Sequence, residues 1–189
     1  MTTNDVLKAI SGRRSVLRFE ATPVSDGELE AILEAGRWAP SYANSQPWTF
    51  VVVRNEETKR ELGKLVERIA FSRRGQVALS GKGVGDAPVV IAVVADPVKD
   101  PRHWIEAGAV ATQNMALMAH SLGLSSYWAG LVGQGGGRSA EAEAGRILEI
   151  PRGLRVVALL PIGKPAYEPK DGTRVPITEI VRHDRFGEG

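Results

Sequence analysis

The sequence of 189 residues contains no cysteine. This absence excludes disulfides, thiolate catalysis and zinc centres with sulfur ligands, and it fits the cytoplasm. Histidine is also scarce: His103, His120 and His183 lie far apart and lack the spacing of metal ligands. We therefore expect no metal site.

An excess of one charge sign is also missing, because 24 Lys and Arg stand against 22 Asp and Glu, for a formal net charge of +2. The most basic stretch, residues 59–82, is interleaved with Glu61 and Glu67, which is typical of a solvated helix face. A protein that binds duplex nucleic acid usually concentrates its basic residues on one face. We expect no nucleic-acid partner.

Targeting and membrane segments are not recognisable. Residues 1–8 lack a basic segment followed by an apolar run, so we expect no signal peptide and a cytoplasmic location. The long apolar stretch at residues 105–122 contains Glu106, Gln113 and His120, each costly in lipid. We expect no membrane partner.

Helical and extended patterns alternate along the chain, which predicts a single domain over residues 1–189, of class α/β or α+β with one central sheet. Ser25 and Glu28 form a capping box at the start of one helix. The uninterrupted apolar run at residues 88–95 predicts a strand covered on both faces. The other predicted helices cover residues 4–11, 55–69 and 139–148, and the other predicted strands cover residues 49–53, 155–160 and 177–181.

The helix predicted at residues 105–122 carries small and apolar residues on every side. A helix that is apolar all round is buried all round. Eighteen residues span about 27 Å, which is long for the centre of so small a domain. We therefore expect this helix to be buried between two protomers of a homodimer.

Two segments are candidates for chemistry. In Arg13-Arg14-Ser15, two guanidiniums and a hydroxyl suit phosphate oxygens, although a solvated basic turn is the commoner explanation of such a tripeptide. The loop at residues 38–48 is bounded by two Trp and fixed by two Pro. Its amides and hydroxyls donate and accept hydrogen bonds, which suits an uncharged heterocycle.

Together these segments resemble the FMN-dependent nitroreductase family. The resemblance continues, in order, through Ala107-Gly108-Ala109, Gln113-Asn114, residues 122–124, residues 127–130, residues 160–165 and Arg174. It implies an α+β, nitroreductase-like fold with a central, mostly antiparallel sheet flanked by helices. It also implies an intertwined homodimer with FMN at the subunit interface and a C-terminal segment that embraces the partner.

The resemblance also implies roles for individual residues. The cofactor-binding residues would fall into three groups: Arg13, Arg14, Ser15 and Arg174 at the phosphate and ribityl chain; Pro40, Ser41, Asn44 and Gln46 along the flavin ring, in part from the partner subunit; and Trp128, Ala129 and Gly130 near the flavin N5 edge. No side chain would be an obligatory acid or base, because the flavin carries the chemistry. Hydride would pass from NAD(P)H to the flavin and then to a nitroaromatic, quinone or related acceptor, in a ping-pong sequence.

Two positions depart from the family pattern. Leu17 stands where a basic residue usually faces the flavin pyrimidine, with Arg18 next to it, and Gly172 stands where one branch has Lys. Two alternatives therefore remain open. One is a relative with another reaction, such as dehalogenation, flavin fragmentation or deazaflavin use, although the deiodinase lid residues are not evident between Phe71 and Asp86. The other is a non-catalytic flavin-binding protein.

Overall fold

The computed structural model describes residues 4–72, 81–133 and 139–187. The helices are α1 (Asp5–Gly12), α2 (Asp26–Arg37), the 3-10 turn η1 (Tyr42–Asn44), α3 (Glu56–Ser72), α4 (Gly81–Asp86), α5 (Trp104–Ser121), α6 (Ala140–Ile147) and α7 (Ile177–Ile180). The strands are β1 (Trp48–Val53), β2 (Val89–Ala95), β3 (Ser125–Ser126), β4 (Ala129–Gly130) and β5 (Arg155–Gly163).

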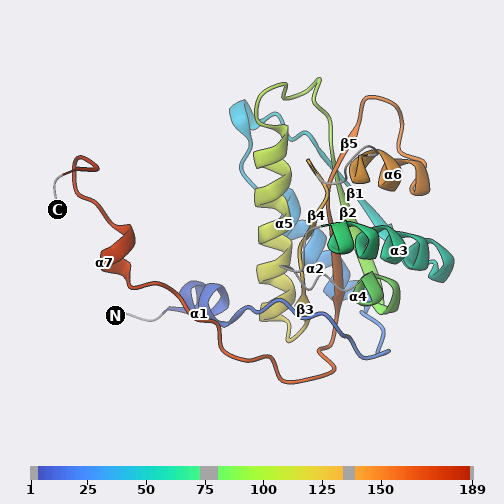
Figure 1. The fold of residues 1–189 in the computed structure, drawn as a ribbon, viewed down its shortest axis with the longest axis horizontal. Helices are drawn as coiled ribbons and strands as arrows, with labels where there is room; N and C mark the ends of the chain where they lie inside the picture. The colour runs from blue at the N-terminus through green and yellow to red at the C-terminus, as the bar shows by residue number, and fades with distance from the viewer. Residues whose placement is uncertain (1–3, 73–80, 134–138, 188–189) are drawn as a thin grey trace.

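These strands form one sheet in the order β1-β2-β5-β3, with β4 also paired to β5. Every pairing between named strands in the described ranges is antiparallel. The expected antiparallel sheet flanked by helices is therefore confirmed. Figure 1 shows α5 on one side of the sheet and α3, α4 and α6 on the other.

The interior position of β2 in the sheet explains why its sequence is apolar throughout. Val90, Ala92 and Val94 join one core cluster with residues of α3, α4 and α6. The alternate residues Val89 and Ile91, with others of that register, join a second cluster with α2 and α5. Because side chains alternate across a strand, a strand buried on both faces needs apolar residues throughout.

Local signals place the early helices correctly. The Asn4 side chain accepts a hydrogen bond from Leu7 N at 2.8 Å, which caps α1. At α2, Ser25 N donates to Glu28 Oε2 at 2.8 Å and Glu28 N donates to Ser25 Oγ at 3.3 Å. The predicted capping box is therefore confirmed.

Two segments differ from their predictions. The extended piece predicted at residues 177–181 is wrong: residues Ile177–Ile180 form a short helix, and the described chain gives them no strand to pair with. Helix α4 was not predicted, because its three glycines favour a loop. These glycines allow a close approach to α3, since a Cβ on Gly81 would lie 2.1 Å from Gly63 O. Of the predicted loop at residues 133–137, only Gly133 lies within the described residues, with φ of +69°.

Helix α5 packs one face on the sheet, through residues such as Ala111, Met115 and Ala119. Its other face is open in a single chain, where Ile105 is 40% and Val110 is 36% exposed. One chain therefore does not supply the all-round burial that the sequence pattern predicts. None of the helices in the described ranges is long and apolar enough to cross a membrane.

The C-terminal segment leaves the body of the molecule after β5. All residues from 172 to 187 are exposed, and Figure 1 shows α7 far from the sheet, beyond α1. This exposed segment carries several large apolar side chains: Val175, Ile177, Ile180, Val181 and Phe186.

Candidate functional site

Arg13 lies at the C-terminal end of α1, where its backbone N–H donates to Ala9 O at 3.2 Å. Its side-chain Nε is buried and has no hydrogen-bond partner among the described residues. Burial lowers the pKa of Arg13, and the nearby guanidiniums of Arg174 and Arg14 lower it further. A buried donor without an acceptor, beside two other cations, is an arrangement that an anion would stabilise.

Most hydrogen-bond donors of the Arg14 side chain are engaged within the chain itself. Its Nε donates to Lys170 O at 3.2 Å, and its Nη2 pairs with Asp171 Oδ1 at 2.9 Å. Its Nη1 donates to Ser11 O at 2.5 Å. Arg14 thus clips the start of the C-terminal segment to the end of α1.

Arg174 completes the cationic cluster from the C-terminal segment. Its Nη1 donates to Thr173 O at 2.7 Å. A Cβ on Gly172 would lie 3.0 Å from that Nη1 and 3.7 Å from Arg14 Nε. Glycine at position 172 therefore lets the two guanidiniums approach each other, and a lysine there would compete with Arg174 for the same space.

Ser15 joins this cluster to the edge of the sheet. Ser15 forms an isolated parallel bridge with Ser126, and Val16 N donates to Ser126 O at 3.1 Å. Ser126 begins a short run that leads through Trp128 into β4, Ala129–Gly130. The structure therefore brings the predicted phosphate residues and the Trp128–Gly130 segment to neighbouring parts of the fold.

The loop at residues 40–47 has a strained backbone. Ala43, Asn44 and Gln46 have φ of 50°, 56° and 45°, in the left-handed region that favours glycine. Such conformations persist where the surroundings impose them, and they cluster at functional sites. Within the loop, Gln46 N donates to Ser41 Oγ at 3.0 Å.

In one chain this loop and the cationic cluster lie at opposite ends of α5. Pro40 and Tyr42 line a cavity of about 290 Å³ with His103 and Val110, at the helix N-terminal end. At the other end, a Cβ on Gly12 would lie 2.6 Å from His120 Nε2. From residue 103 to residue 120 the helix rises about 25 Å at 1.5 Å per residue. A single chain therefore does not bring Asn44 and Gln46 to the cationic cluster.

Leu17 and Arg18, which depart from the family pattern, both pack against the chain itself. Leu17 is partly buried and packs against the core cluster that includes α3. The Arg18 guanidinium lies 5.2 Å from the ring centroid of Tyr167, and Leu17 N donates to Tyr167 Oη at 3.3 Å. Arg18 is thus stacked on an aromatic ring of the chain after β5.

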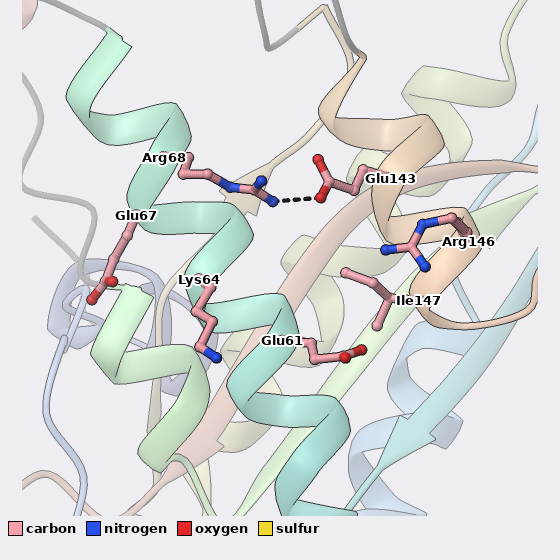
Figure 2. Close-up of a pocket in the computed structure, with 7 residues that line it drawn as sticks. All are labelled: Glu61, Lys64, Glu67, Arg68, Glu143, Arg146 and Ile147. Atoms are coloured by element: carbon pink, nitrogen blue, oxygen red, sulfur yellow. Dashed lines mark hydrogen bonds and ion pairs between the residues drawn. The ribbon is translucent and has the colours of Figure 1, made fainter.

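A larger cavity, of about 540 Å³, lies between α3 and α6. Figure 2 shows Arg68 of α3 reaching across it to Glu143 of α6, an ion pair of 2.5 Å. Three acidic and three basic side chains line it beside Ile147, so their formal charges cancel: Glu61, Glu67, Glu143, Lys64, Arg68 and Arg146. This balance does not select an anionic ligand. The described residues contain no group of acidic and histidine side chains that could hold a metal ion.

The profile of the Nitroreductase family matches residues 10–164. A candidate NADH dehydrogenase/NAD(P)H nitroreductase of Methanothermobacter thermautotrophicus is 35% identical over 172 residues, which cover 90% of this chain and 81% of that protein. The chain belongs to the nitroreductase family. Another relative is the FMN reductase (NAD(P)H) of Bacillus subtilis, 28% identical over 188 residues, which cover 95% of this chain and 73% of that protein.

A solved nitroreductase structure matches the fold as well. A candidate nitroreductase of Desulfovibrio desulfuricans, in complex with FMN, superposes with a TM-score of 0.73 at 32% identity. The match covers 98% of this chain and 99% of that one. The expected nitroreductase-like fold is therefore confirmed.

Sequence reasoning missed several residues that contact the predicted site residues. Asp171 and Tyr167 contact Arg14 and Leu17 from more than 140 positions away in sequence, so no local pattern links them. Asp100 is buried and reaches the strained loop, although its surroundings in sequence look like a surface turn. His120 lacks the spacing of a metal ligand in the sequence, yet its ring packs beside Gly12, next to Arg13.

Proposed function

We propose that this protein is an FMN-dependent oxidoreductase that takes hydride from NAD(P)H. The observation that carries the proposal is the cluster of Arg13, Arg14 and Arg174, with a buried Arg13 Nε that has no acceptor among the described residues. Membership of the nitroreductase family and the names of the FMN reductase and FMN-complexed relatives support it.

The residues present fit the terminal phosphate of FMN. Arg13 and Arg174 would donate to the phosphate oxygens, and Ser15 would add a hydroxyl donor. Arg14 would hold the C-terminal segment in place, and its positive charge would also attract the phosphate. A charge-assisted hydrogen bond from Arg13 Nε would give that buried donor its missing partner. FMN, when bound, supplies the hydride chemistry, and the chain supplies position and exclusion of water.

The flavin ring would require a second copy of the chain. A two-fold axis across α5 would bring the N-terminal end of one helix beside the C-terminal end of the other. Such a homodimer would carry the Pro40, Ser41, Asn44 and Gln46 loop of one chain to the cationic cluster of its partner, and the Trp128, Ala129 and Gly130 segment would complete the ring site. It would also cover Ile105 and Val110, which one chain leaves open.

The second substrate would be a small aromatic, nitroaromatic or quinone-like acceptor that takes the place of the nicotinamide. One shared site would give ping-pong kinetics. No acidic or basic side chain is required for this transfer, because the flavin donates and accepts the hydride.

The test is purification of the protein followed by visible absorbance, mass identification of the group released on heating, and light scattering. We expect FMN, bound without covalent linkage, in a dimer of about twice 20.3 kDa. Oxidation of NADPH or NADH in the presence of a quinone should give parallel double-reciprocal plots. Release of FAD, or a colourless protein that ignores added FMN, would overturn the proposal.

A further inference from the structure

Asp100 is a buried carboxylate in the connection between β2 and α5, and it is 2% exposed. Its Oδ1 accepts a hydrogen bond from His103 N at 2.9 Å, which fixes the turn before α5. Its Oδ2 accepts from Ser45 Oγ at 3.3 Å, from the strained loop. The two oxygens of one carboxylate therefore join the turn to the loop.

The loop needs such a restraint. Ala43, Asn44 and Gln46 all adopt a backbone conformation that is unfavourable for residues with a Cβ. Its hydrogen bonds from Asn44 N to Ser41 O, from Ser45 N to Tyr42 O and from Gln46 N to Ser41 Oγ are internal, so they do not fix its position. Contacts that cross to the body of the protein must do this.

The turn before α5 supplies two such contacts from side chains. One is the hydrogen bond from Ser45 to Asp100. The other is the Tyr42 ring, whose centroid lies 5.1 Å from that of His103. A buried carboxylate is costly unless it is hydrogen-bonded. The arrangement in which both oxygens of Asp100 accept hydrogen bonds is therefore strongly preferred over one in which either oxygen lacks a donor.

From this geometry we infer that Asp100 is a positioning residue of the flavin-ring site. Its carboxylate holds Ser45, and through Ser45 it holds the strained backbone that presents Asn44 and Gln46. Capping of the turn before α5 would require only Oδ1, whereas the contact of Oδ2 with Ser45 links the turn to the loop. The inference rests on the proposed function, in which this loop lines the flavin ring.

The first experiment measures amide hydrogen exchange in the flavin-free protein. Asp100→Ala and Ser45→Ala should each speed exchange at residues 44–46 about tenfold, because loss of a hydrogen bond to a carboxylate favours local opening. Ser45→Ala removes the loop side of the contact alone, so it remains informative if Asp100→Ala folds poorly. Asn55→Ala is the control: its side chain accepts from Thr58 N at the start of α3, away from the loop. The control should leave exchange at residues 44–46 unchanged.

The second experiment measures the dissociation constant for FMN by quenching of flavin fluorescence. Asp100→Ala and Ser45→Ala should each weaken FMN binding about tenfold. The double variant should be no weaker than Asp100→Ala, because both changes remove the same contact. Asp100→Asn should restore most of the affinity, since its amide keeps an acceptor for His103 N and a polar partner for Ser45.

Unchanged exchange in both variants would overturn the inference, and so would faster exchange with unchanged FMN affinity. Failure of the unaltered protein to bind FMN would overturn the proposed function and with it the flavin role of Asp100. The exchange measurement would then still decide whether Asp100 restrains the loop.

Discussion

Replacement of Arg13 by Met should have opposite effects on the flavin-free and the flavin-bound protein. Without an anion, the Arg13 charge lies beside two other guanidiniums, and its buried Nε lacks a partner in the described structure. Met keeps most of the aliphatic stem and removes the charge. The flavin-free variant should therefore be as stable as the unaltered protein or more stable.

The flavin-bound state should lose what Arg13 gives to the phosphate. Loss of a charge-assisted hydrogen bond costs about 1.5–3 kcal/mol, which is roughly 10- to 150-fold in affinity. At a flavin concentration of about 100 Kd, the unaltered protein gains about 2.7 kcal/mol. A variant that binds 100-fold more weakly gains only about 0.4 kcal/mol at the same concentration.

Chemical denaturation with and without FMN tests both parts of this prediction. Arg60→Met, on the exposed side of α3, removes the same charge away from the cluster and should leave the flavin-dependent gain intact. The phosphate assignment would be refuted by an Arg13→Met protein that is less stable than the unaltered protein without flavin, yet still gains about 2.7 kcal/mol of unfolding free energy from FMN.

Three further predictions test other parts of the structure. Gly108→Ala should cost about 1–3 kcal/mol of unfolding free energy, because its Cβ would lie 2.7 Å from Val157 Cγ2 between α5 and β5. Gly27→Ala, where a Cβ meets nothing within 4 Å, should instead stabilise by about 0.5–1 kcal/mol, and denaturation curves compare the two. Burial lowers the pKa of His120 below its ordinary value of 6.5, and the nearby guanidiniums of Arg13 and Arg14 lower it further. The folded chain therefore binds fewer protons than the unfolded chain, so this residue makes stability fall as pH drops from 6.5 through the folded pKa. NMR titration should show that pKa rising when FMN neutralises those guanidiniums, and an unchanged value would place the phosphate elsewhere. Arg14→Ala should speed proteolysis of the segment after β5, since it removes the clip to that segment; cleavage at the unaltered rate would contradict this role.

Local sequence patterns determined much of this protein. The Ser25–Glu28 pair fixed the start of α2, and the apolar run in β2 required a strand covered by helices on both faces. The ordered motifs from Arg13 to Arg174 resembled one family over nearly the whole chain, and the family assignment is confirmed. These features depend on residues close together in sequence, or on the order of short motifs, so they can be predicted from the sequence alone.

The tertiary structure decided what depends on contacts between distant segments. The ion pair between Arg14 and Asp171 joins residues 157 positions apart and ties the C-terminal segment to the end of α1. The three glycines of α4 allow this helix to pack closely against α3. Residues 177–180 form a helix where the described chain offers no strand for pairing. The separation of the loop from the cationic cluster by most of the length of α5 also follows from packing alone. No periodicity records such distances, because folding brings together residues whose separation in sequence carries no local signal.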